Sequence, residues 1–354
     1  MELIGLLQDA LKRDVSDIFI IAGRPLSVKI GSEIEEMGTE KLSTSDTRGF
    51  IEQIYSLQEG RSMRKLLEKG DDDFSFSVRG MGRFRCNAYR QRGSLAAVLR
   101  VVPLELPDYS KLNIPQSVID LYKTNRGLVL ITGPAGSGKS TTLSQIINKI
   151  NETRSCHIIT IEDPIEYLHR HKKSIVSQRE IYQDTGGYVE ALRAALRQAP
   201  NVILLGEMRD YETISTAMTA AETGQLVFST LHTTGVVNTI DRIIDVFPAN
   251  QQQQIRVQLS MVLEAVVSQQ LIPTVDGGVV PAFEVLFVNS AVRNLIREAK
   301  IYQINNVLFS GGSSGMCSMD GEIFRLYESG KISRENALLY CSNLENMKKK
   351  LGVL

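Results

Sequence analysis

Apolar and polar residues alternate in short stretches over the first hundred positions of the chain, which predicts a small α/β domain. A period of two indicates half-buried strands. It recurs over residues 74–78, 83–91 and 95–102, with the turn-forming stretches Arg-Gly-Met-Gly and Arg-Gly between them. We also expect helices over residues 2–12 and 45–55, and strands over 17–22 and 26–30. Three prolines at 103, 107 and 115 then indicate a stiff linker.

Beyond residue 127 the pattern changes to short, continuous apolar runs with helical segments between them. Such runs are typical of strands that are buried on both faces of a parallel sheet. Four of them cover residues 128–132, 157–161, 201–205 and 225–228. The pattern therefore predicts two domains, residues 1–105 and 121–354, joined by a linker at 106–120, with a C-terminal helical region in the second.

Composition narrows the class of protein. The 354 residues include 40 basic and 40 acidic side chains. A balanced charge argues against a protein whose main task is to coat nucleic acid. The four cysteines lie far apart and form no CxxC pair, so neither a zinc ribbon nor a disulfide framework is expected. No apolar run is long enough to cross a bilayer and no signal peptide is evident, so we expect a soluble, cytoplasmic protein.

The stretch ITGPAGSGKSTT at residues 131–142 carries the strongest chemical signal. Gly133, Gly138, Lys139 and Ser140 satisfy the phosphate-loop pattern G-x-x-x-x-G-K-[ST], and an apolar run leads into it as this motif requires. Backbone N–H groups and the following helix N-terminus would hold ATP phosphates, Lys139 would reach the β- and γ-phosphates, and Ser140 would ligate Mg²⁺. The nucleotide-binding set is Gly133, Pro134, Ala135, Gly136, Ser137, Gly138, Lys139, Ser140 and Thr141.

The other three apolar runs also end in chemically useful residues. Ligands of open α/β sheets bind at the carboxyl ends of the strands. Glu207 is expected near Mg²⁺, and Glu162 is a candidate general base for the attacking water. His232 would report the γ-phosphate through a hydrogen bond. The alternatives are glutamates that cap the next helix, as Asp210 is expected to do, and a buried structural imidazole.

Four segments together resemble the motifs of the secretion and type IV pilus ATPases: GPAGSGKS, ITIEDPIEYLH, NVILLGEMRD and VFSTLHTT. They correspond to the Walker A, Asp, Walker B and His boxes. The resemblance implies a PAS-like N-terminal domain, a RecA-like P-loop NTPase C-terminal domain, and a homo-hexameric ring with nucleotide between domains. Gly206 stands where most NTPases have Asp, as in this family, so the site departs from the standard metal site beside Glu207.

Residues 82–93 interleave arginines with aromatic residues, which is one pattern of a nucleic-acid surface. An alternating strand explains the same residues, with Phe84 inward and Arg85 outward. By analogy with the family, Arg85 and Arg100 would reach the γ-phosphate as arginine fingers, within or between subunits. The alternative is a pair of solvated surface arginines.

Residues 291–298, AVRNLIRE, are similar to the AIRNLIRE motif of the PilT family of pilus retraction ATPases. Amphipathic spacing puts Ala291, Val292, Leu295 and Ile296 on one face, which is expected to anchor in the core. Arg293, Arg297 and Glu298 are then expected to be free to couple nucleotide state to a partner.

We therefore expect a hexameric motor ATPase that powers pilus retraction, docked through a platform protein at the inner face of the cytoplasmic membrane, with no stable nucleic-acid partner. A pilus assembly or type II secretion ATPase usually has a longer N-terminal region and a four-cysteine zinc motif, both absent here. A PilU-like accessory paralogue and a RecA-like nucleic-acid translocase also remain open.

Overall fold

The computed structural model describes residues 3–13, 15–31, 33–58, 60–103, 105–310 and 315–353, which form two compact units. The first unit contains Met1–Glu105 and Glu166–Leu168, and the second contains Leu106–Ile165 and His169–Leu354. The expected start of the first helix, at Glu2, lies outside the described residues. The expected linker contains the 3-10 helix η1 (Tyr109–Lys111) and α4 (Gln116–Ile119). A functional division of the chain at these residues stays a prediction.

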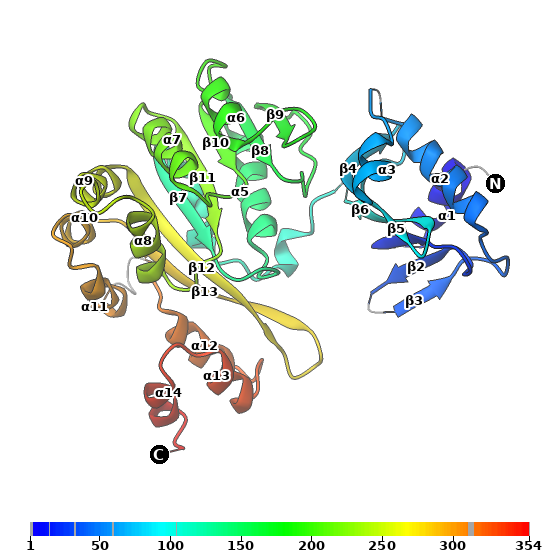
Figure 1. Ribbon diagram of the computed structural model, residues 1–354. Coiled ribbons are helices and arrows are strands. Elements are labelled where there is room, and N and C mark those ends of the chain that lie inside the picture. The colour runs from blue at the N-terminus through cyan, green and yellow to red at the C-terminus, as the bar shows by residue number, and fades with distance from the viewer. Residues whose placement is uncertain are drawn as a thin grey trace. The chain divides into compact units, whose positions relative to one another are not determined.

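The described part of the first unit is built on a six-stranded antiparallel sheet in the order β3-β2-β1-β6-β5-β4 (Figure 1). Its strands are β1 (Asp17–Ile20), β2 (Ser27–Ile30), β3 (Glu33–Glu36), β4 (Asp71–Val78), β5 (Gly82–Gln91) and β6 (Ser94–Val102), and its helices are α1 (Leu3–Leu11), α2 (Thr44–Ser56) and α3 (Arg64–Lys69). The alternation expected for β5 is confirmed, with Phe84 buried and Arg85 half-buried on the other face. The pattern missed β3 because all four of its residues are exposed, and it missed α3, which has six residues.

The second unit is built on a mostly parallel sheet in the order β13-β12-β7-β11-β10-β8-β9. The strands are β7 (Gly127–Thr132), β8 (His157–Glu162), β9 (Ile175–Glu180), β10 (Val202–Leu205), β11 (Leu226–Leu231), β12 (Leu263–Pro273) and β13 (Val279–Phe287), of which β13 pairs antiparallel with β12. The four expected apolar runs are β7, β8, β10 and β11. They pair in parallel as predicted, which confirms the expected α/β class.

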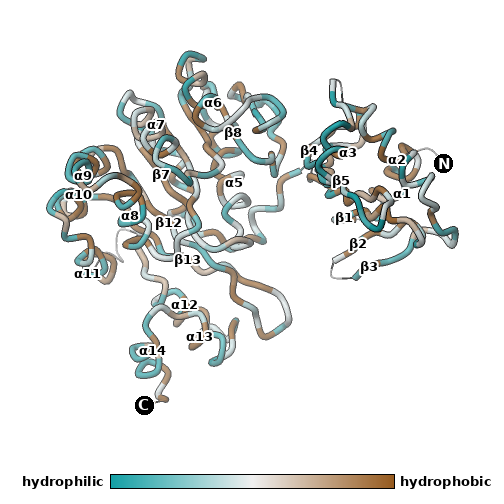
Figure 2. Tube along the Cα trace, viewed as in Figure 1, coloured by the Kyte–Doolittle hydropathy of each residue, from teal (hydrophilic) through white to brown (hydrophobic). Residues whose placement is uncertain are grey.

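Helices cover both faces of this sheet. The helices and helical turns of this part are η2 (Asp120–Lys123), α5 (Lys139–Thr153), α6 (Tyr188–Ala195), α7 (Tyr211–Glu222), α8 (Val236–Asp245), α9 (Gln252–Val262), α10 (Ser290–Arg297), η3 (Ile301–Gln303) and α11 (Ile304–Ser310). Leu128 and Leu130 of β7 pack in the core with α6 to α10, whereas Val129 and Ile131 pack in the core with α4 and α5. Because both faces are covered, the strands are apolar throughout. Figure 2 shows hydrophilic and hydrophobic residues alternating around α9 and α10.

The long hairpin of β12 and β13 was not predicted, because polar residues interrupt the apolar pattern of β12. Ser268 and Gln269 are polar yet buried there. Ser268 pairs with Thr132 at the end of β7, so β12 continues beyond β7 alongside the phosphate loop. The rest of the hairpin packs on α12 (Met319–Glu328), α13 (Arg334–Tyr340) and α14 (Leu344–Lys350) in a separate small core.

Candidate functional site: a phosphate loop at the edge of a parallel sheet

The carboxyl ends of β7, β11, β10 and β8 lie next to one another at one edge of the second sheet (Figure 1). In register, Thr132 pairs with Leu231, and Leu205 pairs with Ile161. The four motifs that follow these strands therefore share one edge, as the sequence predicted. The expected roles of the individual side chains stay predictions.

The phosphate loop leads from β7 into α5 through a left-handed backbone. Gly133 has φ +142° and Gly138 has φ +86°. A Cβ at Gly133 would lie 2.0 Å from the main-chain oxygen of Gln269, so no larger residue fits there. The N-terminus of α5 has no side-chain cap, so its backbone N–H groups remain available to an anion. Of the other expected loop residues, Pro134, Ala135, Gly136 and Ser140 are exposed, Thr141 is half-buried and Ser137 is buried.

Lys139 folds back over its own loop. Its Nζ donates hydrogen bonds to the carbonyl oxygens of Gly133 and Pro134 at 2.9 and 2.8 Å. Burial lowers the pKa of Lys139, and the nearby Glu207 carboxylate acts in the opposite direction. The hydrogen bonds of an ammonium group become stronger when charged phosphate oxygens replace neutral carbonyl oxygens as the acceptors. The lysine is therefore held within reach of a ligand in the loop.

The Ser137 hydroxyl is a further feature of the loop that suits phosphate binding. Its Oγ is buried and has no hydrogen-bond partner in the described part of the chain. Buried hydroxyls are normally paired. Together with the uncapped helix end and the positive-φ glycines, this unpaired donor fits a nucleotide phosphate.

The Gln269 side chain, on β12, packs against the phosphate loop and the start of α5. The sequence did not predict this residue as part of the site. Its Oε1 accepts a hydrogen bond from the hydroxyl of Thr142 at 2.8 Å, across 127 positions of the chain. Its Nε2 lies 2.9 Å from the position that a Cβ would take at Gly138. The side chain is 3% exposed. No local motif marks a glutamine on an unpredicted strand, so the sequence held no usable signal for it.

Glu162, the expected base, ends β8 with an oriented carboxylate. Its Oε1 accepts hydrogen bonds from the hydroxyl of Thr160 at 2.6 Å and from Nε2 of Gln178, on β9, at 3.4 Å. Gln178 also accepts a hydrogen bond from the backbone N–H of His169 at 2.7 Å. A carboxylate that is already positioned suits the abstraction of a proton from water.

Glu207 and His232 meet at this edge. His232 Nε2 lies 3.3 Å from Glu207 Oε2, and Arg209 Nε donates to Glu207 Oε1 at 2.7 Å. The His232 side chain is 51% exposed, so the alternative of a buried structural imidazole is wrong. Asp210 caps α7 by accepting from the N–H of Thr213 at 2.9 Å. The cap is thus supplied by Asp210, as expected, and not by Glu207.

Arg85 and Arg100 lie side by side on β5 and β6 of the first unit, where they are paired residues. Arg85 donates to Asp73 at 2.7 and 3.2 Å, and Arg100 Nε donates to Asp17 at 2.9 Å. Each of the two adjacent guanidinium groups is therefore paired with its own carboxylate, which offsets their mutual repulsion. The side chains remain 36% and 65% exposed, so both guanidinium groups are accessible to a ligand.

The oxygen donors for magnesium are sparse. The described residues contain no group of three or more His, Cys, Asp or Glu side chains that could hold a metal. Mg²⁺ commonly takes one or two protein oxygens, substrate phosphates and water. Ser140 and Glu207 fit that requirement. Because both carboxylate oxygens of Glu207 already face Arg209 and His232, a contact from Glu207 to the ion fits best through water.

The amphipathic helix expected at 291–298 is α10, and three details of that prediction are wrong. Val292 and Ile296 are fully buried and Leu295 is half-buried, but Ala291 is exposed. Arg293 is not free: its guanidinium donates to the carbonyl oxygens of Ser260 and Met261 and to Glu264 at 2.7 to 2.9 Å. It thereby satisfies carbonyl groups at the C-terminal end of α9. Glu298 is not free either, because its Oε2 accepts a hydrogen bond from Lys300 Nζ at 2.8 Å. Arg297 is exposed, as expected.

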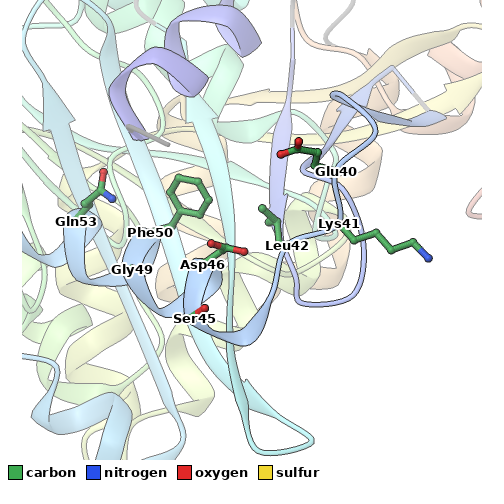
Figure 3. A pocket seen from close by; sticks show the side chains of 8 residues that line it. All are labelled: Glu40, Lys41, Leu42, Ser45, Asp46, Gly49, Phe50 and Gln53. Carbon is green, nitrogen blue, oxygen red and sulfur yellow. The ribbon is translucent and has the colours of Figure 1, made fainter.

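A hollow of about 360 Å³ lies in the first unit between α2 and the segment before it (Figure 3). Its polar groups serve the local fold. Asp46 forms a capping box with Ser43, and Gln53 Oε1 accepts from the backbone N–H of Leu3 at 3.0 Å. The hollow carries no evident chemistry.

A phosphate-binding loop beside carboxylates at strand ends can bind a triphosphate and activate a water molecule to attack its γ-phosphate. That combination defines a P-loop ATPase, and the relatives of this chain agree with it. A family described as "Type II/IV secretion system protein" matches residues 3–311. The chain belongs to this family.

The similarity covers more than nine tenths of the length of several relatives. The chain is 44% identical over 337 residues to the "Type IV pilus retractation ATPase PilT" of Pseudomonas aeruginosa, covering 95% of this chain and 97% of that protein. It is 37% identical over 349 residues to the "Type IV pilus ATPase PilU" of the same organism, covering 98% and 91%. A crystal structure of the pilus retraction motor PilT with bound ADP superposes with a TM-score of 0.91 at 46% identity, covering 99% of both chains.

The described helices include none that is both long and apolar enough to cross a membrane.

Proposed function

We propose that this chain is the motor ATPase that powers retraction of a type IV pilus. The observation that carries the proposal is the convergence of the phosphate loop, Glu162, Glu207 and His232 on one sheet edge, in a chain similar to PilT over 95% of its length. The motor works as a homo-hexamer in the cytoplasm. It docks at the inner face of the cytoplasmic membrane only through the platform protein of the pilus machine, with no stable nucleic-acid partner.

In this proposal the loop residues bind ATP with Mg²⁺, and Lys139 exchanges its two loop carbonyls for the β- and γ-phosphates. Glu162 accepts the proton of the attacking water. Glu207 holds the Mg²⁺ water shell, and His232 reports the γ-phosphate. Arg85 leaves Asp73 and Arg100 leaves Asp17, and both arginines then bind the charge that develops on the phosphoryl group. The nucleotide state therefore determines the binding partners of these two arginines.

The α10 segment favours the retraction motor over the other members of the family, because residues 291–298 are similar to the AIRNLIRE motif. Val292 and Ile296 anchor it, and Arg297 is presented to solvent. A PilU-like accessory role is the second candidate, because the chain also matches PilU over nearly its full length.

Two measurements test the proposal. Purified protein is expected to hydrolyse ATP in a steady-state assay, and Lys139→Ala is expected to abolish turnover while the fold remains. Cells that lack the protein are expected to extend pili and fail to shorten them.

Other outcomes identify the alternatives. Bald cells would identify an assembly motor, and unaltered pili would favour an accessory paralogue. Unaltered pili together with salt-sensitive binding to DNA would identify a translocase.

A further inference from the structure

Tyr188, the first residue of α6, stands at the hydrolytic edge of the sheet but has no part in the roles described above. Its ring is half-buried against the core that α6 shares with β8 and β10. The ring is thus fixed by packing, and the phenolic oxygen extends beyond it toward the strand ends. A tyrosine placed in this way presents an apolar body to the core and a polar tip to the site.

The position of the hydroxyl is set by Gly206, the residue directly before Glu207. A Cβ at Gly206 would lie 3.0 Å from the Tyr188 Oη, and 3.3 Å from both the Cα of Glu162 and the carbonyl oxygen of Ile161. The Tyr188 hydroxyl therefore lies beside the backbone at the end of β8, from which the Glu162 side chain extends. The backbone of Gly206 cannot shift easily, because its N–H donates to the Ile161 carbonyl at 2.8 Å and its own carbonyl accepts from Thr230 at 2.6 Å.

The charges around the phenol keep its proton in place. Burial raises the pKa of Tyr188, and the carboxylates of Glu207, Asp163 and Glu162 raise it further. The hydroxyl is therefore protonated at neutral pH and can both donate and accept a hydrogen bond. A neutral group of this kind can sit beside the γ-phosphate without adding negative charge.

We propose that Tyr188 is a further catalytic residue of the ATPase, whose hydroxyl orients the attacking water. In this arrangement the Tyr188 oxygen accepts one hydrogen atom of that water. Glu162 takes the proton that leaves when the water oxygen bonds to the γ-phosphorus and the bond to the ADP oxygen breaks. With both hydrogens held, a lone pair of the water points at phosphorus. This inference rests on the proposed role of Glu162. It also gives a reason for Gly206, because a Cβ there would crowd the Tyr188 hydroxyl at 3.0 Å.

The test is Tyr188→Phe, which keeps the ring and removes only the oxygen. Tyr211→Phe is the matched control: Tyr211 is the first residue of α7, its ring packs on Phe247 at 4.8 Å, and its hydroxyl lies 3.3 Å from Gln251, outside the site. For Tyr188→Phe we expect kcat to fall at least about tenfold, with the KM for ATP within about twofold of wild type. The control is expected to leave both unchanged.

Thermal unfolding and binding of a nonhydrolysable ATP analogue, measured on both variants, separate catalysis from folding. A Tyr188→Phe protein that turns over ATP at the wild-type rate, or that loses analogue binding as much as turnover, would overturn the proposal. If wild type and the control hydrolyse ATP, such a result removes the role of Tyr188 and leaves the proposed function standing. If wild type itself hydrolyses no ATP, both proposals fail.

Discussion

Replacing Gln269 by Ala tests whether β12 supports the phosphate loop. The change removes the acceptor of the Thr142 hydroxyl, and leaving a buried hydroxyl unpaired costs about 1–3 kcal/mol. It also leaves a cavity next to Gly138, which we expect to cost about 1 kcal/mol more of folding stability. We therefore expect the free energy of unfolding of the second unit to fall by about 2–4 kcal/mol. This corresponds to roughly 5–10 °C in its Tm.

The functional effect of Gln269→Ala should be larger in binding than in chemistry. A loop that the Gln269 side chain no longer supports at Gly138 must be ordered by the nucleotide itself, which weakens binding. We expect the KM for ATP to rise several-fold, by about 1 kcal/mol of binding free energy, with a smaller change in kcat. The assays are thermal unfolding with and without ATP analogue, and steady-state kinetics.

Gln270→Ala is the matched control, because Gln270 is the next residue of β12 and its Nε2 donates to the carbonyl of Tyr340 at 3.1 Å, away from the loop. It should cost about 1 kcal/mol of stability or less and leave the KM unchanged. If Gln269→Ala and Gln270→Ala behave alike in both assays, β12 does not support the loop and the reasoning is refuted.

Glu162→Gln should keep ATP binding and lose turnover in steady-state assays, because the amide keeps the shape but cannot take the proton; loss of binding would make Glu162 structural. Arg100→Ala should lower kcat by roughly 10³-fold with little change in affinity, and an equal loss of both would indicate ground-state binding. Arg297→Ala should leave ATPase activity within a few-fold of wild type yet stop pilus shortening in cells; retraction at the normal rate would contradict coupling through α10. At Asp72, burial alone would raise the pKa, but hydrogen bonds from Arg61 and other neighbours outweigh it and lower the pKa. The stability that Asp72 contributes is present above about pH 4 and is lost as pH falls through the lowered pKa. Asp72→Asn should therefore flatten the acid limb of unfolding free energy measured against pH, and an unchanged limb would refute this.

The parts of the fold that local pattern controls could be predicted from sequence. The apolar runs of β7, β8, β10 and β11 mark buried strands, and the rule for parallel sheets then brings their carboxyl ends together. The phosphate loop is equally local, since its glycines, lysine and serine act within eight consecutive positions. The short exposed strand β3 and the polar stretch of β12 fall outside such rules, because their pairing partners and not their own composition make them strands.

The sequence alone also indicated candidate residues for triphosphate binding and water activation: Lys139, Glu162, Glu207 and His232 stand in or beside recognisable motifs, and their roles stay predictions. Only the tertiary structure decided what surrounds them. It places the Gln269 side chain against the phosphate loop and the Tyr188 hydroxyl next to Gly206. The physical reason is distance along the chain. A motif encodes chemistry over a few residues, whereas a buried hydrogen bond between residues that are 127 positions apart exists only once the strands have paired and the side chains have packed.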